Sequence, residues 1–364
     1  MEIINKFNDA DLSLSLLEKI KEKSKAEINI MEVCGTHTRS IYNFGIDKLL
    51  PKEIKLISGP GCPICVTPMS YIDNAIELTE RKDVIIASFG DMIRVNGSYS
   101  SLSREKAEGK DIRIVYSPLD CLRIAENNKD KEVVFLGVGF ETTEPSIALS
   151  VKYAKMHNIK NYSVLISAKT MINTMKYLIN DKSIEIDGFI CPGHVATIAG
   201  EKVFEDLSKE CSIPMVICGF KRAEILSGVL SIVNKINNCD TDKFDNLYKC
   251  FVKKDGNKKA KEIMNEVFIK CDSYWRGIGR IKESGLQFNE DYSFFDAKRK
   301  FKLKDNNEKP IKDCICGDIL KGVKSPTECR LFGSVCNADN PAGPCMVSNE
   351  GICRIIYERR EILN

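Results

Sequence analysis

The sequence has few of the features that mark membrane, secreted or nucleic-acid-binding proteins. Its 54 lysine and arginine side chains face 51 aspartate and glutamate side chains, a formal net charge of +3. So small an excess predicts no broad nucleic-acid-binding surface. No apolar run approaches the ~18 residues that a membrane-spanning helix needs. Residues 1–20 show no basic region followed by an apolar one, as a signal peptide would. We therefore expect a soluble cytoplasmic protein that binds neither nucleic acid nor membrane.

Nucleotide-binding signatures and sequence repeats are also missing. No G-x-x-x-x-G-K-[ST] occurs, which excludes a P-loop nucleotide site. Gly137 and Gly139 resemble the start of a dinucleotide-binding fingerprint, but the third glycine is absent. The composition, 43% apolar and 29% charged over 364 residues, is that of an ordinary globular protein of about two or three domains.

Cysteine, in contrast, is abundant: the chain has sixteen. A reducing cytosol disfavours disulfides, and a chain of this length can build its own core. Cysteines without neighbours at ligand spacing are expected to be buried as small apolar side chains. These are Cys121, Cys211, Cys218, Cys239, Cys250 and Cys271. The remaining cysteines are clustered, and clustering of thiols indicates metal binding or redox activity.

Short apolar segments alternate with helix-like segments over much of the chain. An amphipathic helix is predicted over residues 9–24. The predicted strands are 28–33, 54–58, 84–89, 112–116, 133–138, 164–167, 189–191 and 215–218. Continuously apolar strands separated by helices predict the α/β class with parallel sheets.

The same pattern suggests three domains. Two Rossmann-like α/β domains with parallel sheets are expected over residues 26–124 and 125–226, divided at the polar stretch 125–131. Residues 227–364 are expected to form a helical and irregular domain that ends in a cysteine-rich tail. The N-terminal segment 1–25 is expected to pack on this third domain.

Reactive side chains follow the carboxyl ends of several predicted strands, where ligands bind in open α/β sheets. In chain order they are Cys34, His37, Cys62, Cys65, Asp91, Glu141 and His194. A thiol and an imidazole three residues apart, as in Cys34 and His37, can share a metal or a proton, and a thiolate suits iron or copper(I). The alternatives for Cys34 and His37 are the catalytic pair of a cysteine protease and a glycine turn with a structural histidine. Asp91 and Glu141 fit either a site or a helix cap.

Cys62 and Cys65 form a C-x-x-C motif, which predicts a redox dithiol or half of a metal site. The predicted helix after it would place its positive dipole end near Cys65 and lower the thiol pKa. Two buried structural cysteines and a zinc half-site are the alternatives, although this half of the chain has no second C-x-x-C pair.

The tail after residue 313 holds six cysteines in a glycine- and proline-rich setting, where a metal cluster could replace secondary structure as the stabilising element. An iron–sulfur cluster needs four thiolates. The spacing C-x14-C-x6-C-x16-C of Cys314, Cys329, Cys336 and Cys353 would supply them. A zinc ribbon is the alternative. Since Cys316 and Cys345 lie in the same stretch, the sequence alone leaves open which four would bind.

Six separated motifs in order resemble the hydrogenase maturation factor family HypD, nearly from end to end. They are Glu32–Thr38, Gly59–Pro68, Ser88–Met92, Gly139–Thr143, Cys191–Val195 and Gly343–Gly351. The resemblance implies a scaffold on which the Fe(CN)2CO unit of [NiFe]-hydrogenases is assembled. It further implies a small HypC-type chaperone, a HypE-type donor that carries cyanide as a thiocyanate on its C-terminal cysteine, and a [4Fe-4S] cluster. Apart from these complexes, the resemblance implies a monomer.

Carried over residue by residue, the resemblance implies that Cys34 is an iron ligand shared with the chaperone. It implies that Cys62 and Cys65 are the redox dithiol between cluster and iron. His37, Asp91, Glu141 and His194 would line the same cleft. The cluster ligands would be Cys314, Cys329, Cys336 and Cys353, with Cys316 in reserve and Cys345 left out. One departure is Asn96, where the family usually has proline; because Gly97 keeps the turn, little effect is expected.

Two other functions fit part of the pattern. A cluster-dependent dithiol reductase acting on protein disulfides would need only Cys62, Cys65 and the tail. A zinc-stapled α/β binding module would need the tail alone.

Overall fold

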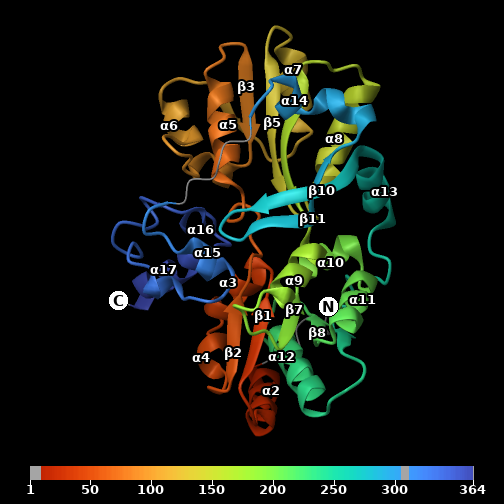
Figure 1. The fold of residues 1–364 in the computed structure, drawn as a ribbon, viewed down its shortest axis with the longest axis vertical. Coiled ribbons are helices and arrows are strands. Elements are labelled where there is room, and N and C mark those ends of the chain that lie inside the picture. The colour runs from red at the N-terminus through yellow and green to blue at the C-terminus, as the bar shows by residue number, and fades with distance from the viewer. Residues whose placement is uncertain (1–9, 305–310, 364) are drawn as a thin grey trace.

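The computed structural model describes residues 10–304 and 311–363, which form two α/β lobes with a cysteine-rich cap at their junction (Figure 1). Lobe A, in the lower half of the view, is built on a sheet of order β2-β1-β7-β8-β9. Lobe B, in the upper half, is built on a sheet of order β10-β11-β6-β5-β3-β4. The mixture of helices with two mainly parallel sheets confirms the predicted α/β class.

Lobe A has only parallel strand pairs within the described residues. Its strands are β1 (Ile28–Glu32), β2 (Ile54–Ser58), β7 (Gly188–Cys191), β8 (Met215–Ile217) and β9 (Phe244–Asn246). Its helices are α2 (Ala10–Lys23), α3 (Gly35–Asn43), α4 (Ile46–Leu49), α9 (Met171–Asn180), α10 (Gly193–Ala199), α11 (Lys202–Cys211) and α12 (Arg222–Asn237). Every residue of β7 and β8 is buried, as strands covered on both faces by helices must be.

Lobe B combines a parallel sheet with an antiparallel hairpin. The parallel strands are β3 (Val84–Ser88), β4 (Ile112–Ile114), β5 (Glu132–Gly139) and β6 (Tyr162–Lys169), and the hairpin is β10 (Phe268–Trp275) with β11 (Gly279–Phe288). The helical elements are α5 (Met69–Thr79), η1 (Gly90–Arg94), α6 (Leu102–Ala107), α7 (Asp120–Asn127), α8 (Glu144–Met156), α13 (Lys258–Val267), η2 (Glu290–Phe295) and α14 (Ala297–Lys300). The carboxyl ends of the parallel strands of both lobes face the junction (Figure 1).

The strands group differently from the predicted domains. All eight predicted strands are present, but β1 and β2 share a sheet with β7–β9, whereas β3 and β4 pair in the sheet of β5 and β6. Residues 26–124 therefore supply two strands to each lobe, and a boundary at 124/125 does not separate the lobes. Periodicity identifies each strand but carries no information about its partner, because every buried parallel strand has the same apolar pattern.

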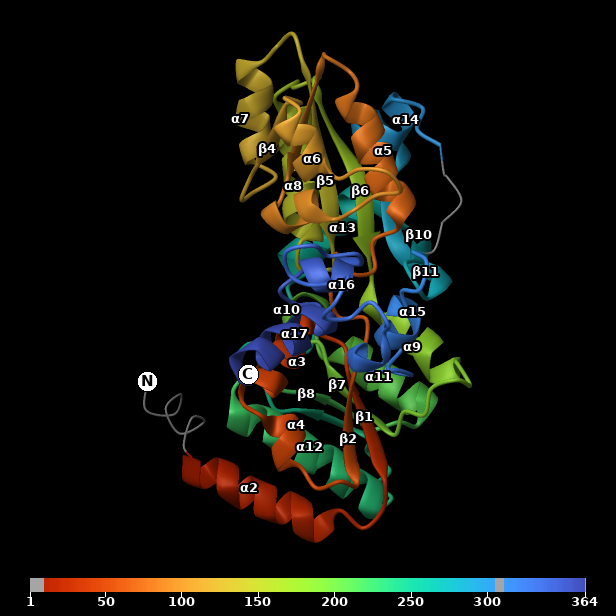
Figure 2. The same cartoon turned by 90° about the vertical axis from the view of Figure 1, so that its left-hand side faces the viewer.

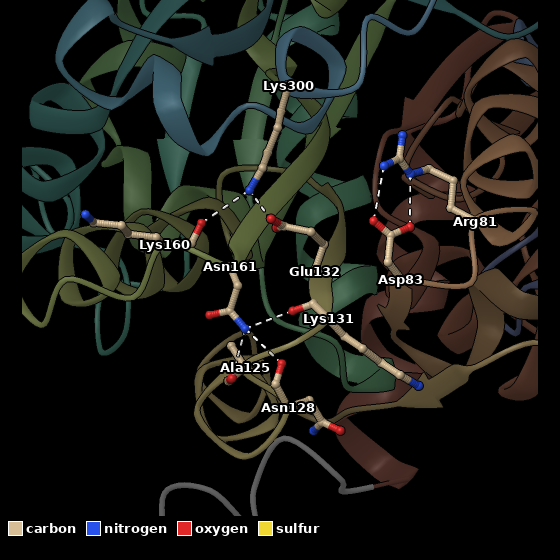
Figure 3. Close-up of polar contacts among 9 residues, drawn as sticks. All are labelled: Arg81, Asp83, Ala125, Asn128, Lys131, Glu132, Lys160, Asn161 and Lys300. Carbon is tan, nitrogen blue, oxygen red and sulfur yellow. Dashed lines mark hydrogen bonds and ion pairs between the residues drawn. The ribbon is translucent and has the colours of Figure 1, made fainter.

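The polar stretch 125–131, predicted to divide two domains, is a turn held inside lobe B (Figure 3). The Asn161 side-chain amide donates to the carbonyls of Ala125, Asn128 and Lys131 at 2.9, 3.1 and 2.9 Å. Next to it, Lys300 Nζ of α14 donates to the Glu132 carboxylate at 2.6 Å. These contacts tie the turn to the beginnings of β5 and β6. The stretch is therefore polar because it forms a hydrogen-bonded turn, and not because it links two domains.

Asn161→Leu is expected to lower the free energy of unfolding by about 1–3 kcal/mol, because three backbone carbonyls lose their donor. Urea unfolding measures the change. Asn180→Ala is the matched control, since that exposed amide makes one bond to the Lys176 carbonyl within α9 and should cost less than about 0.5 kcal/mol. Equal losses in the two variants would contradict the role given to Asn161.

The predicted third domain, residues 227–364, is only partly correct. Its first helix, α12, is where α2 packs, and Lys23 Nζ donates to Asn234 Oδ1 at 2.7 Å. Residues 1–9 of the predicted N-terminal segment lie outside the described residues. The stretch expected to be helical and then irregular contains β9, β10 and β11. The hairpin escaped prediction because its polar residues do not alternate cleanly with its apolar ones: several neighbours in β10 are all exposed or half-buried.

The cap consists of residues 311–363 and sits at the junction of the lobes (Figures 1 and 2). It contains α15 (Cys316–Leu320), η3 (Pro326–Glu328), α16 (Pro344–Val347) and α17 (Ile352–Leu363). Arg39 of lobe A donates to the Asn349 carbonyl at 2.8 Å, and Arg94 of lobe B donates to the Val347 carbonyl at 3.0 Å. Asn96 donates to the Pro341 carbonyl at 2.7 Å, so this side chain helps to hold the cap.

No helix in residues 10–304 and 311–363 combines the length and the apolar character needed to cross a membrane.

Candidate functional site

Cys34 lies where β1 ends and α3 begins, and Glu32 fixes its position. The Cys34 N–H donates to Glu32 Oε2 at 3.1 Å, the Thr38 hydroxyl donates to Oε1 at 2.5 Å, and the Ser58 hydroxyl donates to the same oxygen. Burial raises the pKa of Glu32 to about 8, although these hydrogen bonds oppose the shift. The carboxyl group therefore anchors the first turn of α3 to the end of β2.

The Cys34 thiol is buried, with 7% of its residue surface exposed. Burial raises its pKa to about 12, while the backbone N–H groups of His37 and Thr36 favour the thiolate. Those N–H groups belong to the first turn of α3, where the helix dipole attracts negative charge. A metal ion would shift this balance, because a thiol loses its proton when it becomes a ligand.

The loop that carries the C-x-x-C motif touches the Cys34 loop through Gly61. A Cβ added at Gly61 would overlap the backbone N and Cα of Cys34, so only glycine allows this approach. The Gly35 N–H donates to the Gly61 carbonyl at 3.1 Å. The two loops meet because β1 and β2 are neighbours in register, with Glu32 opposite Ser58.

Cys62 and Cys65 form a disulfide, and both are buried. A redox dithiol is the prediction for this pair, and a disulfide is the oxidised form of such a dithiol. The Cys65 N–H also donates to Cys62 Sγ at 3.2 Å. The following helix, α5, begins at Met69, beyond Cys65, and the effect of its dipole on the Cys65 thiol stays a prediction.

His37 is fully buried, and its Nε2 contacts the Gly219 carbonyl at 3.1 Å and Cys218 Sγ at 3.9 Å. These contacts hold the imidazole against the loop that follows β8. That Cys34 and His37 share a metal or a proton stays a prediction. Burial lowers the pKa of His37 to about 4.

An aromatic stack brings His194 to His37. The Phe220 ring lies 4.4 Å from the His37 ring and 4.2 Å from the His194 ring. His194 is exposed, and partial burial lowers its pKa. The stack forms because the residues follow β1, β7 and β8, whose carboxyl ends meet at one sheet edge.

The His37 environment predicts a pH-dependent stability. Its pKa is about 4 in the folded chain and 6.5 in the unfolded chain, so below pH 6.5 only the unfolded chain binds the proton. Stability is fully present above pH 6.5 and falls toward pH 4, by at most about 3 kcal/mol. His37→Gln should flatten this part of the profile in urea unfolding at several pH values. A variant as steep as the parent chain would contradict the prediction; His157→Gln, exposed after α8, controls for loss of an imidazole.

Asp91 and Glu141 follow strands of lobe B. Glu350 of the cap interacts electrostatically with Asp91, accepts from the Thr36 hydroxyl at 3.0 Å and packs against Gly35, so Asp91 approaches the Cys34 loop. Glu141 accepts from the Met171 N–H at 2.8 Å, and burial raises its pKa to about 7. The placement of Glu141 in one cleft with Cys34 stays a prediction.

The six tail cysteines line one small cavity with Ile319, Leu331, Phe332, Gly343 and Met346. They are Cys314, Cys316, Cys329, Cys336, Cys345 and Cys353. Thiols contact one another in two pairs, Cys314 with Cys316 and Cys345 with Cys353. The structure thus brings together the four predicted ligands, and it also brings in Cys316 and Cys345.

The chemistry of this cavity fits an iron–sulfur cluster. It offers more than four thiols among apolar side chains, and the Ala342 N–H donates to Cys336 Sγ at 3.3 Å, a bond that also suits a ligating sulfur. Within residues 10–304 and 311–363, no three cysteine, histidine, aspartate or glutamate side chains are grouped to hold one metal ion. Cluster thiolates are spaced more widely, because each binds a different iron.

Sequence reasoning missed several residues around the site. Glu32 and Glu350 belong to motifs that were recognised, but neither was assigned a role. Glu144 is fully buried, and both its carboxylate oxygens lack a hydrogen-bond partner among the described residues. Arg276 is also buried, and its two terminal nitrogens likewise lack a hydrogen-bond partner among the described residues. No motif marks Arg276 in the sequence; its position directly after the single tryptophan is the only signal.

The isolated cysteines divide into two groups. Cys121 and Cys218 are buried, as predicted. Cys239 and Cys250 are exposed, and Cys211 and Cys271 are half-buried, contrary to the prediction. The prediction failed because cysteines in turns and at helix ends, and Cys271 in the largely exposed strand β10, are not constrained to face a core.

Comparison with known proteins gives concordant matches over nearly the whole chain. A family model named HypD, described as "Hydrogenase formation hypA family", matches residues 11–360. The chain is 40% identical to hydrogenase maturation factor HypD2 of Bradyrhizobium diazoefficiens over 97% of this chain and 95% of that protein. It is 39% identical to HypD of Cupriavidus necator over 98% and 97%, and 36% identical to HypD of Escherichia coli over 99% of both chains.

Proposed function

Because the chain belongs to the HypD family of hydrogenase maturation factors, we propose that it is the scaffold on which the Fe(CN)2CO unit of [NiFe]-hydrogenases is assembled. In this proposal Cys34 holds the iron, the Cys62/Cys65 pair supplies electrons for cyanide transfer, and the cap holds a [4Fe-4S] cluster.

One observation carries the proposal: three groups of cysteines meet at the junction of the lobes. Cys62 and Cys65 share a hydrophobic core with Cys336, Cys345 and Cys353 of the cap. Gly61 joins the same loop to Cys34. A ligand at Cys34 and a cluster in the cap would therefore lie on either side of the disulfide.

Iron that carries cyanide and carbon monoxide is the cargo, and it needs soft ligands and open coordination positions. Cys34 offers one thiolate at the N-terminus of α3, which leaves the other positions to a partner and to the diatomic ligands. The Cys34 proton leaves when the iron binds. Glu32 accepts from the Cys34 N–H and so fixes the backbone that carries the thiol.

The Cys62/Cys65 dithiol can release cyanide from a protein thiocyanate in a balanced reaction. One thiolate attacks the sulfur that carries the cyanide, the S–C bond breaks and cyanide leaves. The other thiolate attacks the resulting mixed disulfide, so the donor leaves as a thiol and Cys62–Cys65 is oxidised to the disulfide. The two electrons come from the dithiol. Of the two dithiol protons, one goes to the donor thiol and the other leaves with cyanide as hydrogen cyanide.

A [4Fe-4S] cluster held by Cys314, Cys329, Cys336 and Cys353 would supply single electrons when bound. The residues of this chain exclude water from the cluster site and position its ligands. Apolar side chains of the cap, among them Leu331 and Phe332, keep water from the thiolates, and the Ala342 N–H holds Cys336 in place.

The partners belong to this proposal as well. We infer a small HypC-type chaperone that shares the iron at Cys34 and a HypE-type protein that donates cyanide. The chain would work in the cytoplasm and be monomeric outside these complexes. A monomer that associates transiently leaves Cys34 available to each partner in turn.

Metal analysis of anaerobically purified protein tests the proposal against the alternatives. The expected result is about four iron and four acid-labile sulfide per chain, as a [4Fe-4S] cluster requires. Zinc without labile sulfide would contradict the proposal and favour the binding module. Iron and sulfide without any dependence of function on Cys34 would favour the protein disulfide reductase.

A further inference from the structure

We propose that the buried guanidinium of Arg276 is the positive counter-charge of the anionic group held by the cap cysteines, and that it raises the reduction potential of that group. The inference rests on the proposed function, because it requires a cluster in the cap.

No described residue pairs with the terminal nitrogens of Arg276. Only 4% of its surface is exposed, and Nη1 and Nη2 find no hydrogen-bond partner within residues 10–304 and 311–363. Burying a cation without a partner is strongly unfavourable. Because arginine keeps its proton in proteins, the missing compensation points to a bound anion.

The position of Arg276 identifies the anion. It lies in the turn between β10 and β11, and its backbone N–H donates to the Val66 carbonyl, one residue beyond Cys65, at 2.9 Å. The next residue, Gly277, has φ +77° and packs on Gly317: a Cβ there would lie 2.7 Å from the Gly317 Cα. The turn is therefore wedged between the disulfide loop and α15.

The hairpin gives this turn a fixed place. Trp275 is fully buried, its indole N–H donates to the Ser284 hydroxyl at 2.8 Å, and its ring stacks on Phe140 at 5.8 Å. A side chain that starts from so rigid a point loses little freedom when it orders its guanidinium toward a ligand.

The charge of Arg276 reaches the cap thiols. Arg276 interacts electrostatically with Cys314, Cys316 and Cys345, all of which line the cap cavity.

Four thiolates around one cluster collect negative charge in an apolar cavity, and reduction adds more. A fixed cation nearby stabilises the more negative state more strongly. Arg276 therefore favours the reduced cluster, and removing its charge should lower the midpoint potential. The backbone N–H of the same residue contacts the Val66 carbonyl, next to the disulfide.

The test is a redox titration of the full chain, followed by electron paramagnetic resonance, in four proteins. R276M removes the charge and R276K keeps it. R280M removes an exposed arginine from the same hairpin, where solvent screens the charge. The midpoint potential should fall in R276M, and it should stay near that of the parent chain in R276K and R280M.

The emission of Trp275, the single tryptophan, and circular dichroism report whether the variants fold. If R276M folds but loses iron and sulfide while R276K keeps both, the charge is needed to hold the cluster, which supports the proposal. If R276M does not fold, R276Q takes its place as the neutral variant.

Two results would overturn the inference while leaving the proposed function standing. One is an unchanged midpoint potential in a folded, cluster-bearing R276M or R276Q. The other is loss of the cluster from folded R276K and R276M alike. That result would mean that the shape of the arginine side chain, and not its charge, is needed to hold the cluster. A parent chain without iron and sulfide would instead overturn the proposed function, and this inference with it.

Discussion

Replacing Cys34 with alanine is expected to abolish binding of the iron that carries cyanide, while the iron and sulfide of the cap stay at the level of the parent chain. Cys34 is the thiol at the start of α3, held by Glu32 and in contact with the disulfide loop, whereas the cap cysteines line a separate cavity. Removing one soft ligand from an open site leaves the iron without its protein anchor.

The measurement is the cyanide released by acid from the purified protein, together with its total iron. Cys121→Ala is the matched control, because Cys121 is also buried, its pKa is also raised to about 12 chiefly by burial, and it lies in α7 of lobe B. The control should keep the cyanide of the parent chain. Retention of cyanide by the Cys34 variant would show that the iron is held elsewhere.

Cys62→Ser is expected to stop release of the donor as a free thiol. The remaining Cys65 thiol can attack the donor and displace one cyanide, but it has no neighbour at this spacing to resolve the mixed disulfide. The reaction would therefore stop at a covalent adduct between the two proteins. Cys65→Ser should trap the donor in the same way.

Single-turnover assays with the reduced protein, and mass spectrometry of the products, check this prediction. Cys239→Ser removes an exposed thiol from lobe A and should release the donor thiol at the rate of the parent chain. Release of the donor thiol by both the Cys62 and the Cys65 variants would contradict the two-electron role of the pair. A covalent adduct in one variant alone would identify its remaining cysteine as the attacking thiol.

Part of the site was predictable because reactive residues at strand ends must meet when their strands are neighbours. Cys34 and Cys62 follow β1 and β2, which pair in register, so their loops touch. His194 follows β7, the other neighbour of β1, and it reaches His37 through Phe220. The rule that ligands bind beyond the carboxyl ends of parallel strands covers all of these residues.

The rest depended on long-range packing that the sequence does not encode locally. The direction of the His37 ring is set by the Gly219 carbonyl, far away in the chain. The pairing of β1 with β7 could not be inferred from two equally apolar segments. The position of the cap depends on single side chains such as Arg39, Arg94 and Asn96, none of which belongs to a periodic pattern.

The cap connects the two halves of the proposed function. Glu350 bonds to Thr36, close to Cys34, and Cys353, one of the four proposed cluster ligands, follows Glu350 in the next stretch of the cap. The loop that would hold the iron is therefore tied to a segment that supplies a cluster ligand. Movement of the cap away from the lobes would break this contact and separate the two sites.

An infrared spectrum of the anaerobically purified chain, co-expressed with the other maturation proteins, tests the central claim most directly. Cyanide and carbonyl stretches fall where protein absorbs little. The account predicts bands of both kinds in the parent chain and none in the Cys34→Ala variant. A parent chain that contains iron and sulfide but shows no such bands would contradict the scaffold function and leave the dithiol reductase as the better description.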